Sequence, residues 1–129
     1  MGAYAVTKNV VTQSYKVDAT VTPVAGADDI ARYRIVKLLS TGDHTIIYAT
    51  DATDVYAGVT VCGGNVGDIL DVQQGGMAIV EAGGAIAVND PIIAGTAGVA
   101  MTGAGIRLGQ AVTSATNAGD LIVVQIDQG

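Results

Sequence analysis

The chain offers few side chains that could carry out chemistry, and the most reactive kinds occur once each. His44, Cys62 and Glu81 are the single histidine, cysteine and glutamate among 129 residues. His44 follows Ser40 and Asp43 closely, but a Ser-His-Asp triad is defined by geometry, and no serine here lies in a nucleophile-elbow pattern. We therefore expect His44 to be a polar residue that begins a strand after a turn.

The remaining reactive residues are too few for a metal or redox site. Cys62 ends an alternating segment and has no basic neighbour in the sequence, so we expect a buried thiol that packs as a small hydrophobe. One histidine and one cysteine fall short of the three or four ligands of zinc. Asp51 and Asp54 alone do not reach the roughly six to eight oxygens of a calcium site. The sequence predicts no catalytic residue, no metal and no cofactor, and therefore no enzyme.

The glycine-rich segments are better explained as turns than as phosphate-binding loops. Residues 63–67 read Gly-Gly-Asn-Val-Gly, but they lack the Lys-Ser/Thr ending of a P-loop and no helix is expected after them. The segments 83–84 and 103–105 also precede no helical pattern. We expect hairpin turns at all three places, where glycine accepts positive φ.

The elements that must carry these residues are short strands. Residues 10–22 alternate, with Val11, Tyr15 and Val17 on one side, which predicts a strand with one buried face. Turn residues recur about every eight to twelve positions, as in sandwiches and small barrels. Pro91 should lie at a strand start or edge. Further strands are expected at 33–39, 44–50, 58–62, 68–73, 77–82, 98–101, 106–113 and 120–126.

The composition of the core favours assembly. Half of the residues are apolar, yet the chain has no Phe or Trp and only five Tyr. Its core must be built from Val, Ile, Leu, Met and Ala, whose smaller side chains bury less area each. We expect a monomer of modest stability that gains from burial against other subunits.

Three sequence landmarks recur in the same order, which predicts an internally duplicated β unit. Residues 67–75 return as 119–129, residues 58–61 as 109–112, and residues 42–49 as 89–94. We predict an all-β fold, a small barrel or β-sandwich-like body at residues 30–129, preceded by an extended N-terminal arm at residues 1–29.

The net charge of −6 is divided unevenly between arm and body. The first 37 residues hold five basic residues against three aspartates, a net charge of +2, whereas Arg107 alone faces nine acids in the remainder, a net charge of −8. Such a body suits neither nucleic acid, which needs concentrated positive charge, nor a membrane, because no apolar run is long enough to span one. No secretory signal is expected at the N-terminus.

The arm is the strongest candidate for binding a partner. A strand over residues 10–22 could reach about 40 Å and add to the edge of another sheet, or it could form an edge strand of its own domain. Both alternatives remain open at the level of sequence. The candidate residues for contact with a partner are apolar (Tyr4, Val6, Val11, Tyr15 and Val17) or basic (Lys8, Lys16, Arg32 and Arg34).

From about Ile35 to the end, the sequence resembles the capsid cement (head decoration) proteins of tailed bacteriophages. The resemblance covers about three-quarters of the chain, and residues 1–30 match less well. Its motifs are Gly-Asp-aliphatic-x-Val, a longer Gly/Ala-rich run, Asn-Asp-Pro-Ile, Gly-Gln-Ala and Ala-Gly-Asp-Leu-Ile-Val-Val, at residues 67–72, 76–86, 89–92, 109–111 and 118–124.

The resemblance implies a barrel-like body, a homotrimer and the major capsid protein as partner. It implies a non-enzymatic decoration protein on the outer capsid surface of the virion, made in the host cytoplasm, that stabilises the head. The alternative is a host-surface or carbohydrate-binding β module of a virion fibre or adhesin. A hydrolase with an aspartate-based site is disfavoured by the scarcity of His, Glu, Cys and Ser.

Overall fold

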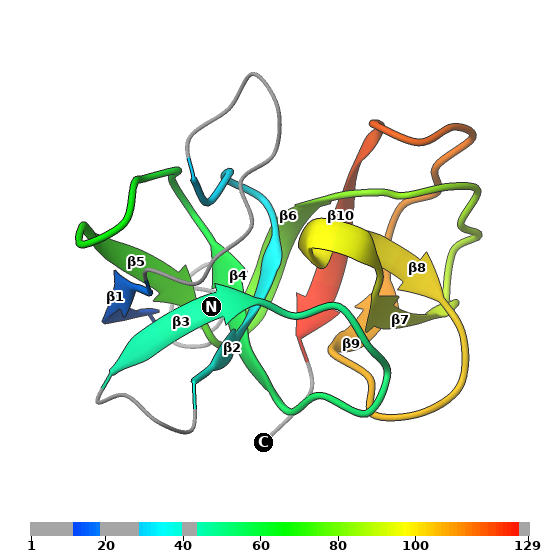
Figure 1. Cartoon of the computed structure of the whole chain (residues 1–129). Coiled ribbons are helices and arrows are strands. Elements are labelled where there is room, and N and C mark those ends of the chain that lie inside the picture. Colours follow the sequence, from blue (N-terminus) through cyan, green and yellow to red (C-terminus); the bar gives the residue numbers. More distant parts are fainter. Residues whose placement is uncertain (1–11, 19–28, 40–43, 127–129) are drawn as a thin grey trace, which may run out of the picture.

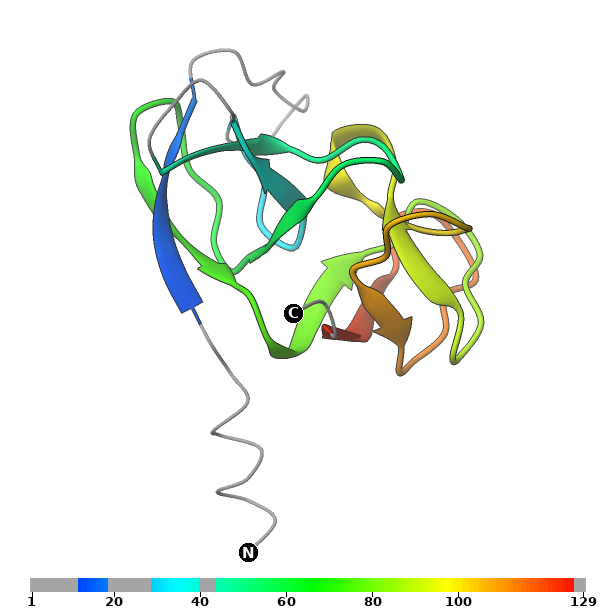
Figure 2. The same ribbon diagram turned by 90° about the horizontal axis from the view of Figure 1, so that it is seen from below.

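The computed structural model describes residues 12–18, 29–39 and 44–126. Within these ranges the chain forms ten short strands and one 3-10 turn, joined by turns and loops. Strands β1–β5 close into a barrel, and β6–β10 form a second five-stranded sheet beside it (Figure 1). The connection from β5 into β6 carries the chain from the barrel to the second sheet (Figure 2). The predicted all-β fold with a small barrel is confirmed.

The strands are short, as the spacing of turn residues predicts. The barrel has the order β1-β3-β2-β4-β5, and its strands are β1 (Thr12–Val17), β2 (Ile35–Leu38), β3 (Thr45–Tyr48), β4 (Tyr56–Thr60) and β5 (Ile69–Gln73). The second sheet has the order β6-β10-β9-β7-β8, with β6 (Gly76–Glu81), β7 (Pro91–Ala94), β8 (Ala100–Thr102), β9 (Gly109–Ala111) and β10 (Leu121–Ile126). Pro91 begins β7, at a strand start as predicted, and the 3-10 turn η1 (Thr96–Gly98) joins β7 to β8.

The duplication is visible in the topology itself. Reading the barrel as β3-β2-β4-β5-β1 and the second sheet as β8-β7-β9-β10-β6 gives the same path in both. The parallel pair of β1 and β3 has its counterpart in a parallel bridge between Ala82 and Ala100. The Val17 amide donates to the Asp68 carbonyl at 3.0 Å, and the Ala82 amide donates to the Asp120 carbonyl at 2.8 Å. Each strand of the barrel therefore has an equivalent in the second sheet.

Two of the three sequence landmarks mark truly equivalent strands, and the third is shifted. Residues 58–61 and 109–112 include parts of β4 and β9, and residues 67–75 and 119–129 include β5 and β10, which occupy the same places. The pairing of Ile46 with Ile92 is wrong, because β7 is the counterpart of β2 and not of β3. Both β3 and β7 contain two consecutive isoleucines, so the sequence pattern alone suggested that these strands are equivalent.

One turn recurs before three strands and explains why aspartates follow Gly or Asn. In each turn the aspartate carboxylate accepts a hydrogen bond from the backbone amide three residues earlier, and the residue before the aspartate has positive φ. Asp68, Asp90 and Asp120 therefore have a structural role in closing these turns. The three donor–acceptor pairs are Asn65–Asp68 (2.9 Å), Ala87–Asp90 (2.9 Å) and Asn117–Asp120 (3.0 Å).

Strands β2 and β4 contribute residues to two apolar cores, one inside the barrel and one shared with the second sheet. Val36 and Ala57 point into the barrel, whereas Ile35, Tyr56 and Val59 belong to the apolar cluster of the second sheet. Strand β4 is therefore buried at all five of its residues, because its two faces line two different cores. This double burial fixes the barrel against the second sheet.

The described part of the predicted arm is a strand of the barrel. Tyr15 and Val17 are only 7% and 1% exposed, while their neighbours Ser14 and Lys16 are exposed. Strand β1 pairs antiparallel with β5 and parallel with β3. The predicted alternation is thus confirmed for these residues, and the alternative of a strand within its own domain holds for 12–17. The other residues of the predicted arm, 1–11 and 19–28, lie outside the described ranges, and residues 1–11 remain the proposed arm.

Candidate interaction surfaces

The structure separates the predicted apolar capsid contacts into two groups. Tyr15 and Val17 pack in the barrel interior with residues such as Val36 and Leu70, which corrects their assignment to a contact with another protein. Alternation reveals that a face is buried, but not which molecule buries it. The other apolar candidates, Tyr4, Val6 and Val11, lie outside the described residues, as does the basic candidate Lys8.

Among the basic candidates, Arg34 is buried and binds partners within the chain. Its Nη2 lies 3.0 Å from Glu81 Oε2, and its Nη1 donates to the Ala97 carbonyl at 3.0 Å. Both partners belong to the second sheet and its η1 turn, so the buried guanidinium clamps the barrel to that sheet. Arg34 follows Tyr33, a residue of positive φ, and directly precedes β2. In the second sheet the equivalent position, directly before β7, is Asp90.

Lys16 and Arg32 keep the exposed positions that a contact with another protein needs. Lys16 points outward from β1, and the Arg32 guanidinium lies over the Tyr33 ring at 4.8 Å from its centroid. The cation–π contact holds Arg32 at the surface near the junction of barrel and second sheet. These two cations are not brought together with Arg34.

The single histidine and the single cysteine do not form a site. His44 is exposed just before β3 with a φ of 49°, and its ring stacks on Tyr15 at 5.6 Å, as expected for a polar residue at a strand start. Cys62 is exposed, because β4 ends at Thr60 and the chain turns outward, so the predicted burial is wrong. Within the described ranges, no group of three His, Cys, Asp or Glu residues could hold a metal, and no helix could cross a membrane.

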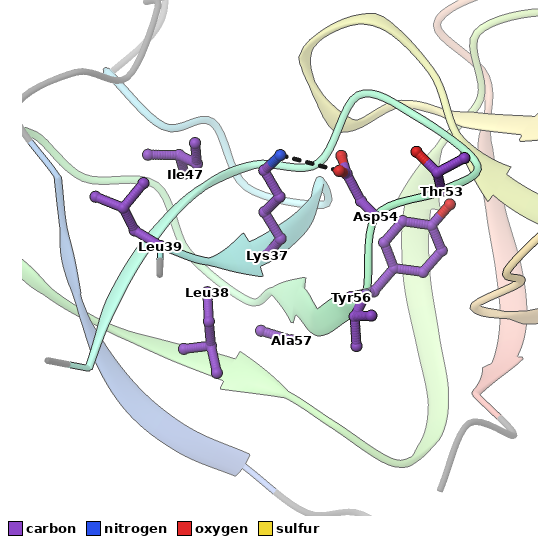
Figure 3. A pocket seen from close by; sticks show the side chains of 9 residues that line it. Lys37, Leu38, Leu39, Ile47, Thr53, Asp54, Tyr56 and Ala57 are labelled. Atoms are coloured by element: carbon purple, nitrogen blue, oxygen red, sulfur yellow. Dashed lines mark hydrogen bonds and ion pairs between the residues drawn. The ribbon is translucent and has the colours of Figure 1, made fainter. Parts of the chain in front are cut away.

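An apolar groove on the outside of the barrel is the first surface that the sequence did not reveal. It encloses about 500 Å³ between β2, β3 and the segment that leads into β4. Leu38 and Val55 are exposed large side chains at its walls. Figure 3 shows Lys37 and Asp54 facing each other within it, with Nζ and Oδ1 3.0 Å apart.

The Asp54 carboxylate of this charge pair is held by a second hydrogen bond. Asp54 Oδ2 accepts from the Thr50 amide at 3.1 Å. Burial alone raises the pKa of Asp54, but the hydrogen bonds from Lys37 and Thr50 outweigh burial and the net pKa is lowered. The Lys37 ammonium has three donors, of which Asp54 takes one in this geometry. The groove thus offers apolar walls and a hydrogen-bond donor, the Lys37 ammonium, to a bound partner.

A second surface lies on the outer side of β6 and β10. Met77, Ile79 and Leu121 are exposed there, and Ile79 stands opposite Val123 in the strand pairing. At its border with the barrel a hollow of about 150 Å³ is lined by Met77, Ile79 and the end of β4. The sequence predicts these strands but not their outer faces, because Met and Ile are usually core residues.

Comparison with known proteins places the fold. No family model and no curated protein sequence matches the chain. The structure is similar to that of the head fiber gp8.5 N base of bacteriophage phi29, with a TM-score of 0.68 and 23% sequence identity. The similarity covers 92% of this chain and 94% of that chain. At this identity the likeness establishes a common fold for the barrel and the second sheet together.

Proposed function

We propose that this protein is a non-enzymatic structural component attached to the outside of a bacteriophage head. The observation that carries the proposal is the fold similarity to a phage head fibre base along nearly the full length of both chains. The motifs of residues 67–124 that resemble capsid cement proteins support it independently. So does the scarcity of reactive residue types, with one histidine, one cysteine and one glutamate in 129 residues.

In its finer form, the proposal is a decoration protein that stabilises the assembled shell. A protein that binds only the assembled lattice of the major capsid protein stabilises that lattice by mass action. A homotrimer would place three identical surfaces on neighbouring capsomers, so that weak single contacts combine. The groove around Lys37 and Val55, the exposed Lys16 and Arg32, and arm residues Tyr4, Val6, Lys8 and Val11 are the proposed contacts.

The alternative function is the base of a virion fibre that carries a host-surface or carbohydrate-binding part. The similar phi29 protein is the base of a head fiber, which favours this candidate over a free adhesin. Both functions share attachment to the head and differ in whether the shell gains stability. The melting temperature of the shells separates them, because only a decoration protein is expected to raise it.

Co-sedimentation with empty shells tests the proposal, and the melting temperature of the shells tests its finer form. We expect the chain to sediment with the shells and to raise their melting temperature. The substitution Val55→Asp places a charge in the groove and should weaken binding about tenfold or more, a loss typical of a central contact. Val88→Asp, at an exposed valine of a turn in the second sheet, is the matched control. Shells that sediment without the chain would refute attachment to the head.

A further inference from the structure

The outer face of β6 and β10 is mostly apolar although solvent reaches it, with Glu81 and Gln125 as its polar members. Met77, Ile79 and Leu121 are 54%, 45% and 53% exposed. Val123 lies between them, opposite Ile79, and the Val112 amide donates to the Val123 carbonyl at 2.8 Å, which extends the face to a further exposed valine. We call Met77, Ile79, Val112, Leu121 and Val123 the β6–β10 face.

The duplicated fold supplies an internal control for this face. Strands β1 and β5 of the barrel are the counterparts of β6 and β10, and their outer residues pair in the same register. In the barrel, the pair equivalent to Ile79 and Val123 is Ser14 and Asp71, joined by a hydrogen bond of 3.0 Å. The barrel therefore carries polar residues where the second sheet has Ile79 and Val123, with Ile69 as its exposed apolar residue, so folding alone does not require an apolar pair at these positions.

The charges around the face indicate which partner covers it. Glu81 is the only charged residue among the outward positions of β6 and β10, and Arg34 already pairs with it. The equivalent face of the barrel instead carries Lys16 and Asp71. Near a symmetry axis identical residues approach one another, so free charges would repel, whereas an uncharged face lets two copies of a chain of net charge −6 meet.

The shape of the region fits the same partner. The hollow of about 150 Å³ beside the face is lined by Val61 from the barrel and by Met77 and Ile79 from the face. It offers a concave apolar place beside convex apolar side chains, and a second copy presents both features in turn. Buried apolar side chains that enter such hollows supply most of the binding energy at protein interfaces.

We propose that copies of this chain assemble by packing their β6–β10 faces against one another. This inference deepens the proposed function, on which it rests, by naming the contact that holds the proposed homotrimer together. It leaves the groove at Lys37 and Asp54, on the outside of the barrel, free for the shell. Assembly and attachment are thus assigned to different parts of the duplicated fold.

The test transplants the polar outer face of the barrel onto the second sheet. The double substitution Ile79→Ser and Val123→Asp reproduces the Ser14 and Asp71 pair, which the barrel already accommodates. Sedimentation velocity of the full chain should show an oligomer for the wild type and monomer for the double variant. Met77→Thr, which copies Thr12 of the barrel, is a milder second variant that should raise the dissociation constant about tenfold. Val88→Asp, in the turn before β7 and 52% exposed, is the control and should leave the oligomer unchanged.

Two outcomes would overturn the inference. One is a wild-type chain that stays monomeric, and the other is a folded double variant, or a Met77→Thr variant, with an unchanged oligomer. If the double variant keeps its oligomer but no longer sediments with shells, the face belongs to the shell contact and not to a second copy. Shell binding is measured separately, so a wild-type oligomer that ignores shells would refute the proposed function while supporting the self-association.

Discussion

Arg34 Nη2 lies 3.0 Å from Glu81 Oε2, and this ion pair joins the barrel to the second sheet. The Arg34 side chain is 8% exposed and the Glu81 side chain 32%, so the cation is the more deeply buried partner. At the equivalent place before β7 the repeat carries Asp90, which only closes its own turn. The two equivalent positions therefore have different roles, because Asp90 closes a turn and Arg34 joins the barrel to the second sheet.

Replacing Arg34 should destabilise the protein more than replacing Glu81. Arg34→Ala leaves Glu81 and the Ala97 carbonyl without their cation, and we expect a loss of about 3 kcal/mol in the free energy of unfolding. Glu81→Gln should cost only about 1 kcal/mol, because its partly exposed carboxylate is already solvated. Urea unfolding measures both losses, and Arg32→Ala, at an exposed neighbour, is the control. Equal losses for Arg34→Ala and Arg32→Ala would contradict the clamp.

Two equivalent glycines should resist substitution for the same reason. A Cβ on Gly58 would collide with the Gln73 carbonyl oxygen, and a Cβ on Gly109 with the Gln125 carbonyl oxygen. Both obstacles are backbone atoms of the neighbouring strand, so we expect each substitution to alanine to cost about 2 kcal/mol or more. Gly84→Ala meets no atom within 4 Å and should change stability by less than about 0.5 kcal/mol in the same thermal melts. A tolerated alanine at Gly109 would show that β9 and β10 are farther apart than described.

The Tyr56 hydroxyl links the segment before β4 to β7. It accepts from the Ala94 amide at 3.0 Å and donates to the Asp51 carbonyl at 3.0 Å. Tyr56→Phe leaves the buried Ala94 amide without that acceptor, so we expect a loss of about 1 to 2 kcal/mol in chemical denaturation. Tyr33→Phe serves as the matched control. The proposed link would be disproved by a Tyr56→Phe variant as stable as the wild type.

Asp120 should make stability fall at acidic pH. Hydrogen bonds from the Asn117 and Thr116 amides lower its pKa below the ordinary aspartate value. A lowered folded-state pKa stabilises the protein above the unfolded-state pKa, and this contribution disappears as pH falls through the folded-state pKa. The difference in melting temperature between wild type and Asp120→Asn should therefore be largest at neutral pH and shrink below roughly pH 4. A difference that grows on acidification would contradict this sign.

Two N-terminal deletions should behave differently because β1 belongs to the barrel. Removing residues 2–11 leaves β1 intact, so we expect the chain to fold with an unchanged free energy of unfolding. We expect this shortened chain to bind shells more weakly. Removing residues 2–22 also deletes Tyr15 and Val17 from the core and leaves β3 and β5 each with one of their two partner strands missing. Circular dichroism and light scattering should then report an unfolded or aggregated chain. Undiminished shell binding by the shorter deletion would remove the arm from the proposed contacts.

The sequence was sufficient to predict strands wherever turn residues bound a β-rich segment. The predicted segments 68–73 and 120–126 match Ile69–Gln73 and Leu121–Ile126 to within one residue at each end. Strand β7 was expected only as a strand start or edge at Pro91. Because β7 and β3 share a run of aliphatic residues, composition could not show which strand is the counterpart of β7, whereas the pairing partners do.

Candidate contact residues were harder to predict, because sequence does not show what covers a side chain. Tyr15 and Val17 alternate correctly, but their covering is the barrel itself. The positive charge of Arg34 suggested exposure, and only the fold brings Glu81, 47 residues later, beside it. The groove around Lys37 also depends on segments that meet only in three dimensions.

A last consequence concerns the contact between the two halves of the duplicated fold. The Gly98 backbone sits so close to the Ile35 carbonyl that a Cβ would strike it, and counting back from the equivalent strands β8 and β3 gives His44 at the same place. The contact between the two halves therefore needs a glycine at 98 and a guanidinium at 34, whereas the equivalent positions carry His44 and Asp90. The two halves are consequently not interchangeable at their contact, although they share one topology.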